Sequence, residues 1–282
     1  MTAIEFWNIG RRKLDLSKRP LVMGILNVTP DSFSDGGKHD TLETAVATAI
    51  QMQTDGAGII DIGGESTRPY SEPVGADEEL RRVIPVIKQL AAKIDIPISI
   101  DTSKAAVAQA AIDAGAEIIN DVTGLEGDKA MPQVAVKSGV GVCVMHMSGT
   151  PQDMQDNPQY DDVVQNIYDY LLQRREFCLA AGISHDRICL DPGIGFGKTH
   201  EHNLTLLNTT DRFAKIGSPI LIGHSRKGFI GKLIGDKTAD RTAATIGVSL
   251  AVAAAGAHVI RVHDVKPTVD ALTLFRASGG LE

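Results

Sequence analysis

The sequence predicts an α/β protein that folds as a single (β/α)8 TIM barrel, with a short N-terminal arm or hairpin covering the bottom of the barrel. Short β-branched runs alternate with longer helical stretches about eight times along the chain. The runs are continuously apolar rather than alternating, as in parallel strands that are covered on both faces. Eight such units close naturally into a barrel, and a doubly wound open sheet is the alternative.

Each expected strand is a short run rich in Ile and Val. In chain order, strands are expected at 21–28, 58–64, 97–102, 117–124, 141–147, 187–193, 219–225 and 258–264. The stretch after the first strand is rich in alanine, which favours a helix, and the later stretches have helical length and composition. Helices are therefore expected at 41–55, 77–93, 104–114, 128–138, 159–181 and 201–215, in the stretch up to 255, and at 267–277.

Length and composition fit one large barrel domain. The chain has 282 residues, of which 43% are hydrophobic, and this is ample for a large buried core. No linker, charge block or low-complexity segment divides it. We therefore expect an N-terminal arm at residues 1–20 and one barrel domain at residues 21–282.

The charge and the cysteine content restrict the compartment and the partners. A net charge of −7 argues against broad nucleic-acid binding, although it does not exclude a local cationic pocket. The three cysteines are odd in number and lack CxxC spacing, which favours free buried thiols in a reducing compartment. The N-terminal segment is charged where a signal peptide is apolar, and no run of about 18 apolar residues predicts a membrane span. We expect a soluble cytoplasmic protein.

Polar residues gather at one place in each unit, the C-terminal end of the strand. In chain order they are Asn27, Asp61, Asp101, Asn120, His146, Asp191, Ser225 and His263. In a barrel these ends converge on one rim, where active sites form. An acid or amide that caps a loop is the simpler interpretation for one strand. It fails for nearly every strand at once, because converging carboxylates need a ligand or metal to offset their repulsion and desolvation.

Cationic residues follow the last two expected strands. They are Arg226 and Lys227 in "GHSRKGFIG", and Arg261 with His263 in "RVHD". Loops after strands seven and eight of barrels often bind phosphate, for which Arg offers a bidentate fork. Arg68 in "ESTRP" could join them. A lone Arg or Lys is usually a solvated surface charge, but the position of these residues at strand ends favours an anion site.

The acids and amides predict a site for an organic ring. Asp61, Asp101, Asn120 and Asp191 suit a heterocycle that is rich in N–H donors and ring acceptors. Magnesium is the competing interpretation, but it usually takes one or two protein oxygens and completes its shell with phosphates and water. Most of the four groups should therefore recognise the organic part of a ligand.

The glycine-rich segment "DPGIGFGKT" matches neither of two nucleotide-binding motifs. A P-loop would need its first glycine at Pro192, and a G-x-G-x-x-G motif would need its last glycine at Lys198. We interpret Gly193, Gly195 and Gly197 as letting the backbone approach a flat ligand closely.

Together, these motifs resemble the bacterial dihydropteroate synthases, pterin-binding TIM-barrel enzymes of folate biosynthesis that sulfonamides inhibit. The matching segments are "GILNVTPDSFSDGG", "DIGGESTRP", "SIDT", "INDVTG", "MHMSGTPQDMQ", "DPGIGFGK", "SRKGFIG" and "RVHDV", in order from about residue 20 to 275. The resemblance implies a homodimeric transferase that condenses 6-hydroxymethyl-7,8-dihydropterin pyrophosphate with p-aminobenzoate. The implied products are 7,8-dihydropteroate and pyrophosphate, and the implied cofactor is Mg²⁺.

The resemblance also implies roles for individual residues. Asn27 matches the magnesium ligand; Asp101, Asn120, Asp191 and Lys227, with walls from Met145 and Phe196, match the pterin-binding set; Thr67, Arg68, Arg261 and His263 match the pyrophosphate anchors; Phe33, Thr67, Pro69, Ser225 and Lys227 match the p-aminobenzoate pocket. Asp61 lies beside the pterin set in a supporting position. Asp101, Lys227 and Asp35 are the expected catalytic residues.

The implied chemistry is a loose, dissociative substitution without a covalent enzyme nucleophile. The leaving group is a stable polyanion, and the pterin can spread positive charge from the methylene carbon. By resemblance, Asp101 favours that cation, Asp35 brings a charge near the reaction, and the segment after Asn27 is a lid. A Ser225–His224 pair is discounted because adjacent strand residues point in opposite directions.

Two positions depart from the family pattern. Tyr70 stands where a small residue, often Gly, is common, and His224 stands where a small or apolar residue is common. Tyr70 is expected to change the mobility of the second loop and the fit of p-aminobenzoate analogues. The remaining histidines, His146 included, are interpreted as surface or structural residues.

Three other functions are weighed against this one. A methyltetrahydrofolate–corrinoid methyltransferase would share the strand-end acids and amides, but it would not need "TPDSFSDGG", "STRP" or the Arg/His clamp. A non-catalytic pterin-binding paralogue would have lost Asn27, Lys227 or the lid. A phosphate-binding isomerase or aldolase would carry a Schiff-base lysine within a strand, and the strand-end position of Lys227 leaves this alternative open.

Overall fold

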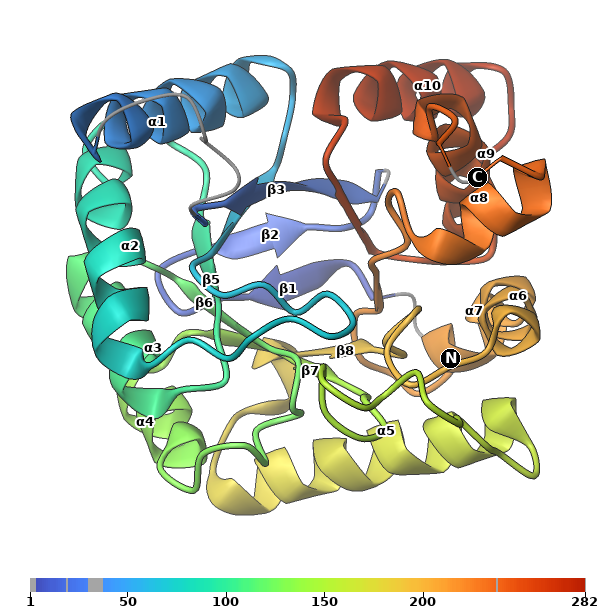
Figure 1. Cartoon of the computed structure of the whole chain (residues 1–282), viewed down its shortest axis with the longest axis horizontal. Helices are drawn as coiled ribbons and strands as arrows, with labels where there is room; N and C mark the ends of the chain where they lie inside the picture. Colours follow the sequence, from blue (N-terminus) through green and yellow to red (C-terminus); the bar gives the residue numbers. More distant parts are fainter. Residues whose placement is uncertain (1–3, 19, 30–37, 237, 282) are drawn as a thin grey trace.

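The structure, a computed structural model, describes residues 4–18, 20–29, 38–236 and 238–281. Eight parallel strands form a nearly closed barrel with helices around it (Figure 1). The strands are β3 (Leu21–Asn27), β4 (Ile59–Gly63), β5 (Ile98–Asp101), β6 (Ile118–Asp121), β7 (Gly141–Met145), β8 (Ile188–Asp191), β9 (Leu221–Ile222) and β10 (Val259–Val262). The predicted TIM barrel is confirmed, and the doubly wound alternative is wrong.

The strand order explains how the sheet closes. Strands β8 to β3 follow one another in reverse chain order, then come β10 and β9. A bridge between Leu190 and Ile220 joins the two ends, and the Leu190 amide donates to the carbonyl oxygen of Pro219 at 2.9 Å. Each pair of neighbours is parallel and in register, so the C-terminal ends of all eight strands meet at one rim.

The helices follow the predicted order. They are α1 (Lys38–Thr54), α2 (Ala76–Leu90), α3 (Ala105–Ala114), α4 (Met131–Ser138), α5 (Val163–Ala181), α6 (His200–Asn208), α7 (Thr210–Ala214), α8 (Gly228–Ile234), α9 (Thr242–Ala254) and α10 (Val265–Ala277). The single helix expected at 201–215 is wrong, because Thr209 has a non-helical φ of −113° and separates α6 from α7. None of the helices in the described parts of the chain is long and apolar enough to cross a membrane.

Side-chain alternation divides the strands into an outer and an inner face. Outward residues such as Ile60, Ile100 and Val144 pack against the helices in one large core. Inward residues near the strand beginnings, such as Met23, Ile118 and Cys189, form a second and smaller core inside the barrel. Because successive strand residues point to opposite faces, the inward positions further along the strands come to lie above this second core.

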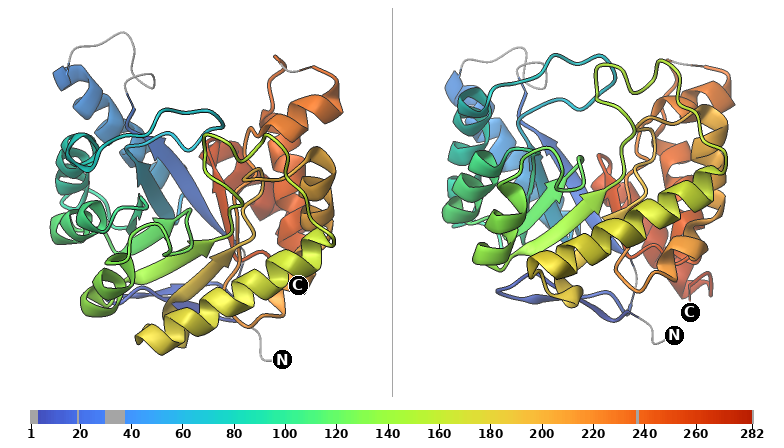
Figure 2. Two further views of the ribbon diagram at one scale, coloured as in Figure 1. Left: turned by 60° about the horizontal axis from the view of Figure 1, so that its bottom comes forward. Right: turned by 90° about the horizontal axis from the view of Figure 1, so that it is seen from below.

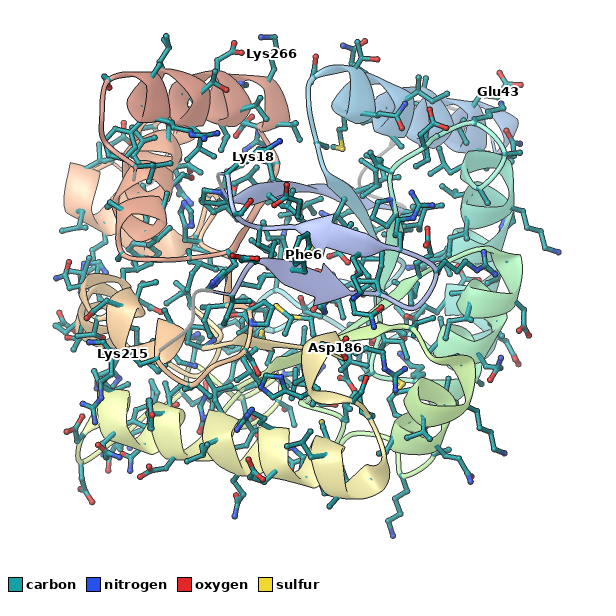
Figure 3. All side chains as sticks on the ribbon, turned by 180° about the vertical axis from the view of Figure 1, so that it is seen from behind. Phe6, Lys18, Glu43, Asp186, Lys215 and Lys266 are labelled. Atoms are coloured by element: carbon teal, nitrogen blue, oxygen red, sulfur yellow. The ribbon has the colours of Figure 1, made fainter. Side chains whose placement is uncertain are left out.

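The N-terminal hairpin covers the bottom of the barrel, as predicted. Strands β1 (Phe6–Asn8) and β2 (Lys13–Asp15) pair antiparallel and lie across the strand beginnings (Figure 3). Trp7 is fully buried in the second core, and its indole Nε1 donates to the carbonyl oxygen of Arg187 at 2.9 Å. Figure 2 shows the hairpin at the end opposite to the long loops that follow β4 and β7. The open rim is therefore at the other end.

The three cysteines are unpaired and buried, as the sequence predicts. Cys143 and Cys189 are directly opposite each other on β7 and β8, inside the barrel, and Cys178 lies on α5. All three sit in apolar surroundings within the two cores. They are structural thiols rather than members of a metal or redox motif.

Candidate active site

Five inward polar side chains form the floor of the site. Asp61 on β4, Asp101 on β5, Asn120 on β6, Asp191 on β8 and Arg261 on β10 all stand above the inner core. The strand register places Asp101 opposite Asn120, and Asp191 opposite Met145. Every second residue of a strand points inward, so the apolar inward residues at the strand beginnings are followed by polar inward residues near the rim. These polar residues form a chamber.

Arg261 lies among the acids instead of in a separate cationic layer. Its Nε donates to Asp61 Oδ2 at 2.6 Å, and its terminal nitrogen Nη2 donates to Asp101 Oδ2 at 2.7 Å. From the sequence, this residue was expected to lie with the cations of the anion site. The difference has an electrostatic cause, since buried carboxylates without a countercharge are strongly unfavourable.

Burial perturbs the acids of the floor. It raises the pKa of Asp101 to about 7 against the opposing effect of Arg261, and it raises the pKa of Asp191. Asp61 Oδ2 also accepts from Asn120 Nδ2 at 3.1 Å, whereas Asp61 Oδ1 is buried without a partner in the described part of the chain. Perturbed acids with unused acceptor capacity are typical of a ligand site.

Lys227 lies at the edge of this floor, before the short helix α8. Its ammonium group donates to the carbonyl oxygen of Ile194 and lies 4.3 Å from the centroid of the Phe196 ring. Burial lowers the pKa of Lys227 to about 7, and the Asp191 carboxylate opposes this shift. Lys227, Phe196 and Asp191 thus meet on one side of the chamber, as the pterin-binding set predicts.

The glycines of the segment after β8 make room for the protein's own atoms, and the predicted close approach of their backbone to a flat ligand stays a prediction. Gly193, Gly195 and Gly197 all have positive φ. A Cβ at Gly193 would lie 1.9 Å from the carbonyl oxygen of His146, and a Cβ at Gly195 would lie 2.8 Å from Cδ of Lys227. These glycines therefore make room for the protein's own side chains and backbone, and Gly195 also lines the cavity described below.

Ser225 and His263 form a pair across the ends of β9 and β10. Ser225 Oγ is 3.0 Å from His263 Nδ1 and accepts from the His263 amide at 3.2 Å. Burial, reinforced by Arg226 and Arg261, lowers the pKa of His263 to about 4. His224 points the other way, to Thr245 and Ser249 on α9, which agrees with the exclusion of a Ser225–His224 pair.

A cavity of about 930 Å³ opens above the floor. It is lined by the predicted residues Asn27, Thr67, Arg68, Pro69, Asp101, Phe196, Ser225, Lys227, Arg261 and His263. Asn120, Asp191 and Met145 lie deeper and are almost fully buried. Phe33 and Asp35 fall outside the described residues.

Four further Lys and Arg residues border the cavity, namely Lys198, Arg226, Lys232 and Arg241, and of these only Arg226 was predicted among the cations of the anion site. Lys198 is buried, and its ammonium group lies 3.0 Å from His146 Nδ1 and donates to the carbonyl oxygen of Phe196 at 2.9 Å. Arg226 pairs with Asp264 through two contacts, at 3.0 and 2.5 Å, and Arg241 donates to the Arg226 carbonyl oxygen at 2.8 Å. In the sequence, Lys198 drew attention only as part of a P-loop motif that did not match. No sequence pattern around it predicts that it is buried.

The side chain of Asn27 has the chemistry and position expected of the one protein ligand of a magnesium ion. Its side chain lines the cavity at the end of β3, and its Oδ1 and Asp101 Oδ2 flank the bare Cα of Gly63. Among the described residues, no cluster of three or more His, Cys, Asp or Glu side chains could hold a metal. A single amide oxygen at the mouth of an anion site suits Mg²⁺, which completes its shell with phosphate oxygens and water.

The fold and the site define a pterin-binding barrel enzyme. The family model described as "Pterin binding enzyme" matches residues 23–263. Dihydropteroate synthase of Escherichia coli K12 is 46% identical over 265 residues, which cover 94% of this chain and 93% of that protein. The chain therefore belongs to the pterin-binding enzyme family, and within it to the dihydropteroate synthases.

Solved structures of the same family share the whole architecture. Dihydropteroate synthase of Yersinia pestis in complex with a sulfonamide drug is 45% identical, with a TM-score of 0.91 over 97% of this chain and 99% of that one. The Xanthomonas albilineans enzyme with 4-aminobenzoic acid is 44% identical, with a TM-score of 0.92 over the full length of both chains. The predicted resemblance is thus confirmed.

Proposed function

We propose that this chain condenses 6-hydroxymethyl-7,8-dihydropterin pyrophosphate with p-aminobenzoate, giving 7,8-dihydropteroate and pyrophosphate in folate biosynthesis. The observation that carries this proposal is the buried floor of acids and an amide beneath a cavity bordered by cations. The floor suits a flat ring with N–H donors, and the cations suit a diphosphate. The relatives reported above carry the same activity in their names.

The pterin ring is proposed to bind to Asp101, Asn120 and Asp191. Their largely buried side chains offer carboxylate and amide acceptors to ring and exocyclic N–H groups. When those N–H groups occupy the Asp101 carboxylate, Arg261 loses one of its two partners. Its guanidinium is then available to the diphosphate at the rim, which reconciles its observed place with its expected role.

The reaction is proposed to begin with loss of the leaving group. The bond between the pterin methylene carbon and the diphosphate oxygen breaks, and its electron pair leaves with pyrophosphate. Arg68, Arg261 and His263 bind that polyanion, and the Asp101 carboxylate favours the positive charge left on the pterin. The arylamine nitrogen then forms a bond to the methylene carbon and releases a proton. Asp35 is proposed to place a further charge near this step.

Magnesium is proposed to bind at Asn27, together with oxygens of the diphosphate. When bound, it would supply charge neutralisation to the leaving pyrophosphate. The amide oxygen of Asn27 adds no charge of its own, so the metal would keep its full attraction for the substrate. Removal of Mg²⁺ by a chelator is expected to lower the rate sharply, and an unchanged rate would remove Asn27 from this role.

The second substrate is proposed to bind between the loop after β4 and the end of β9. Thr67 and Pro69 come from the loop, and Ser225 and Lys227 come from the β9 end, on the same cavity. The Lys227 ammonium attracts the carboxylate of p-aminobenzoate, and Phe33 is proposed as an aromatic wall. Met145 and Phe196 are proposed as walls of the pterin pocket.

A coupled assay for pyrophosphate release tests the function directly. We expect release from the pterin pyrophosphate to depend on p-aminobenzoate and to yield dihydropteroate. Methyl transfer from methyltetrahydrofolate to a corrinoid would favour the methyltransferase alternative instead. Pterin binding without turnover would favour a non-catalytic paralogue, and a borohydride-trapped Lys227 adduct would favour an aldolase.

We also propose that the chain is a cytoplasmic homodimer. The three unpaired cysteines fit a reducing compartment. Helix α9 contains no charged residue, and the exposed Leu233 and Leu274 lie on its neighbours α8 and α10 (Figure 1). Such an apolar surface favours contact with a second copy of the chain.

A further inference from the structure

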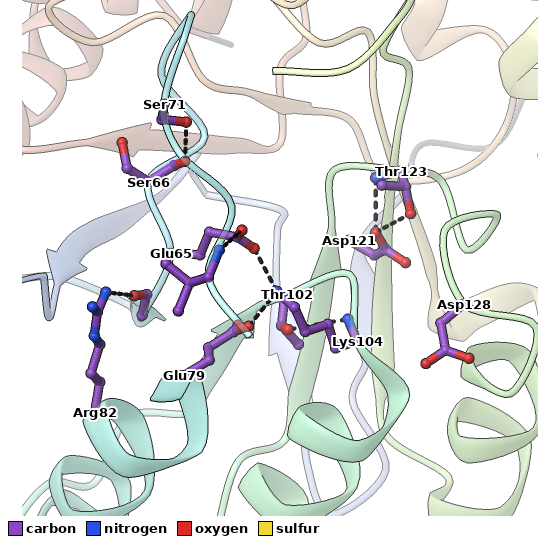
Figure 4. Close-up of polar contacts among 12 residues, drawn as sticks. Glu65, Ser66, Ser71, Glu79, Arg82, Thr102, Lys104, Asp121, Thr123 and Asp128 are labelled. Carbon is purple, nitrogen blue, oxygen red and sulfur yellow. Dashed lines mark hydrogen bonds and ion pairs between the residues drawn. The ribbon is translucent and has the colours of Figure 1, made fainter. Parts of the chain in front are cut away.

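The loop between β4 and α2, residues 64–75, is held at its base by a cluster of three charged side chains. We call this cluster the loop anchor, and it consists of Glu65, Glu79 and Lys104 (Figure 4). The Lys104 ammonium group lies 2.6 Å from Glu65 Oε2 and 2.7 Å from Glu79 Oε2. Lys104 therefore joins the β5–α3 connection to the beginning of the loop and to helix α2.

Glu65 fixes both ends of the loop at once. Its Oε2 accepts from Lys104, and its Oε1 accepts from the Val74 amide at 2.7 Å, nine residues further along the chain. Arg82 adds a contact at the same base, where its Nη1 donates to the carbonyl oxygen of Gly64 at 2.8 Å. A single carboxylate thus closes the loop on itself and ties it to Lys104.

The loop depends on these polar contacts because cavities flank it. Glu65, Ser66 and Thr67 line the 930 Å³ cavity and also a second cavity of about 390 Å³ on the side of β5 and β6. Packing on either face is therefore sparse, and apolar burial contributes little to the position of the loop. Charge-assisted hydrogen bonds at its base are the stronger restraint.

Lys104 also stands close to the floor of the site. It follows Asp101 by three residues, and its amide donates to Thr102 Oγ1 at 3.2 Å. Glu79 is fully buried, so without Lys104 its carboxylate would lack a countercharge and would repel Glu65. The expected result is a displacement of the loop and not only a loss of folding free energy.

We propose that Lys104 is a positioning residue, which through Glu65 holds the 64–75 loop where Thr67, Arg68 and Pro69 face the cavity. Lys104 is not among the residues that line either cavity. The inference rests on the proposed function, because it assigns the loop to the p-aminobenzoate and diphosphate side of the site. The contacts of Arg261 with Asp61 and Asp101 in the pterin floor do not involve the loop anchor, so pterin binding should be unaffected.

The experiment compares Lys104→Met with the unmodified enzyme. We expect the KM for p-aminobenzoate to rise roughly ten- to a hundredfold, since small displacements of positioning groups have effects of this size. Binding of free 6-hydroxymethylpterin, measured by calorimetry, should stay within about twofold. Lys104→Arg, which keeps both ion pairs, should restore most of the affinity. Lys215→Met, which breaks an exposed pair with Asp211 on α7, is the matched control and should change neither value.

A second variant keeps the inference testable if Lys104→Met fails to fold. Glu65→Gln keeps an acceptor for the Val74 amide but weakens the ion pair, and we expect it to raise the same KM. In the double variant with Lys104→Met, the two effects should be less than additive. If the unmodified enzyme released pyrophosphate at a rate that does not depend on p-aminobenzoate, the proposed function would be overturned. Normal release combined with an unchanged KM in both variants would overturn the role of Lys104 alone.

Discussion

At the scale of single residues, Arg261 explains how three acids can share one chamber. Its guanidinium binds Asp61 and Asp101 together, so the floor carries a countercharge before any ligand arrives. A pterin that takes over the Asp101 carboxylate exchanges one set of N–H donors for another. In the proposed complex, the Arg261 guanidinium that this exchange releases from Asp101 becomes available to the diphosphate.

Replacement of Asp101 by Ala should abolish turnover with little loss of stability. The carboxylate is proposed to favour the pterin cation, and we expect kcat to fall by roughly a hundredfold or more. Arg261 keeps its contact with Asp61, and burial already disfavours the charged Asp101 carboxylate, so the Tm should change by only a few degrees. Steady-state kinetics and a thermal melt check this. A fully active variant would contradict the proposed pterin contact.

The binding of pyrophosphate should be linked to proton uptake by His263. The pKa of this residue is about 4 in the free protein, so its imidazole is neutral at pH 7. A bound anion favours the protonated form and raises that pKa, so affinity gains a contribution as the pH falls from 7 to 5.5. Calorimetry in buffers of different ionisation enthalpy measures the uptake.

His263→Asn provides the reference for this measurement. The protonation of pyrophosphate itself is common to both proteins and cancels in the comparison. We expect the variant to take up fewer protons than the unmodified protein. Equal uptake would show that the imidazole stays neutral when the anion is bound.

At the scale of elements, the two long loops of the rim hold each other. The Tyr70 amide donates to the carbonyl oxygen of Pro151 at 2.8 Å, and the Tyr70 hydroxyl donates to Asp156 Oδ1 at 3.2 Å. Gln152 adds a hydrogen bond from Nε2 to the carbonyl oxygen of Ser71 at 2.8 Å. The loop after β4 is therefore fixed at its tip as well as at its base, and Figure 2 shows the two loops meeting above the barrel.

Tyr70→Gly should loosen this contact. Tyr70 has a φ of +64°, which glycine adopts without strain, so the variant keeps the backbone path but loses the hydroxyl contact with Asp156. We expect the KM for p-aminobenzoate and the Kd of a sulfonamide to rise about two- to fivefold, the effect of one modest hydrogen bond. Tyr70→Phe separates the hydroxyl from the ring. Unchanged values in Tyr70→Gly would show that the tip contact does not affect the second substrate.

At the scale of the whole molecule, the sequence predicts the barrel because each strand repeats the same pattern. An apolar run with a polar end predicts a strand whose inward side changes from core to site, and this holds from Asn27 to Asp191. The place of Arg261 could not be predicted, because its partners lie 160 and 200 residues away and depend on the closed barrel. Lys198 and the contacts of Tyr70 are non-local in the same way.

Dimer formation should be sensitive to the outer face of α9. Ala251 is exposed on this uncharged helix, and Ala251→Arg would place a charge in the proposed contact. We expect light scattering to give about twice the mass of 30.0 kDa for the unmodified chain and a lower mass for the variant. Ala106→Arg, on the exposed side of α3, is the control and should leave the mass unchanged. A monomeric unmodified chain would overturn the homodimer.

The hairpin beneath the barrel limits how substrates and products can enter and leave the chamber. Trp7 and its neighbours close the bottom of the barrel, so we expect substrates and products to enter and leave through the rim. In the proposed complex the pterin lies deepest, so an arylamine that bound first would block its entry. The proposed arrangement therefore predicts ordered kinetics, in which the pterin diphosphate binds before the arylamine and pyrophosphate leaves before the coupled product.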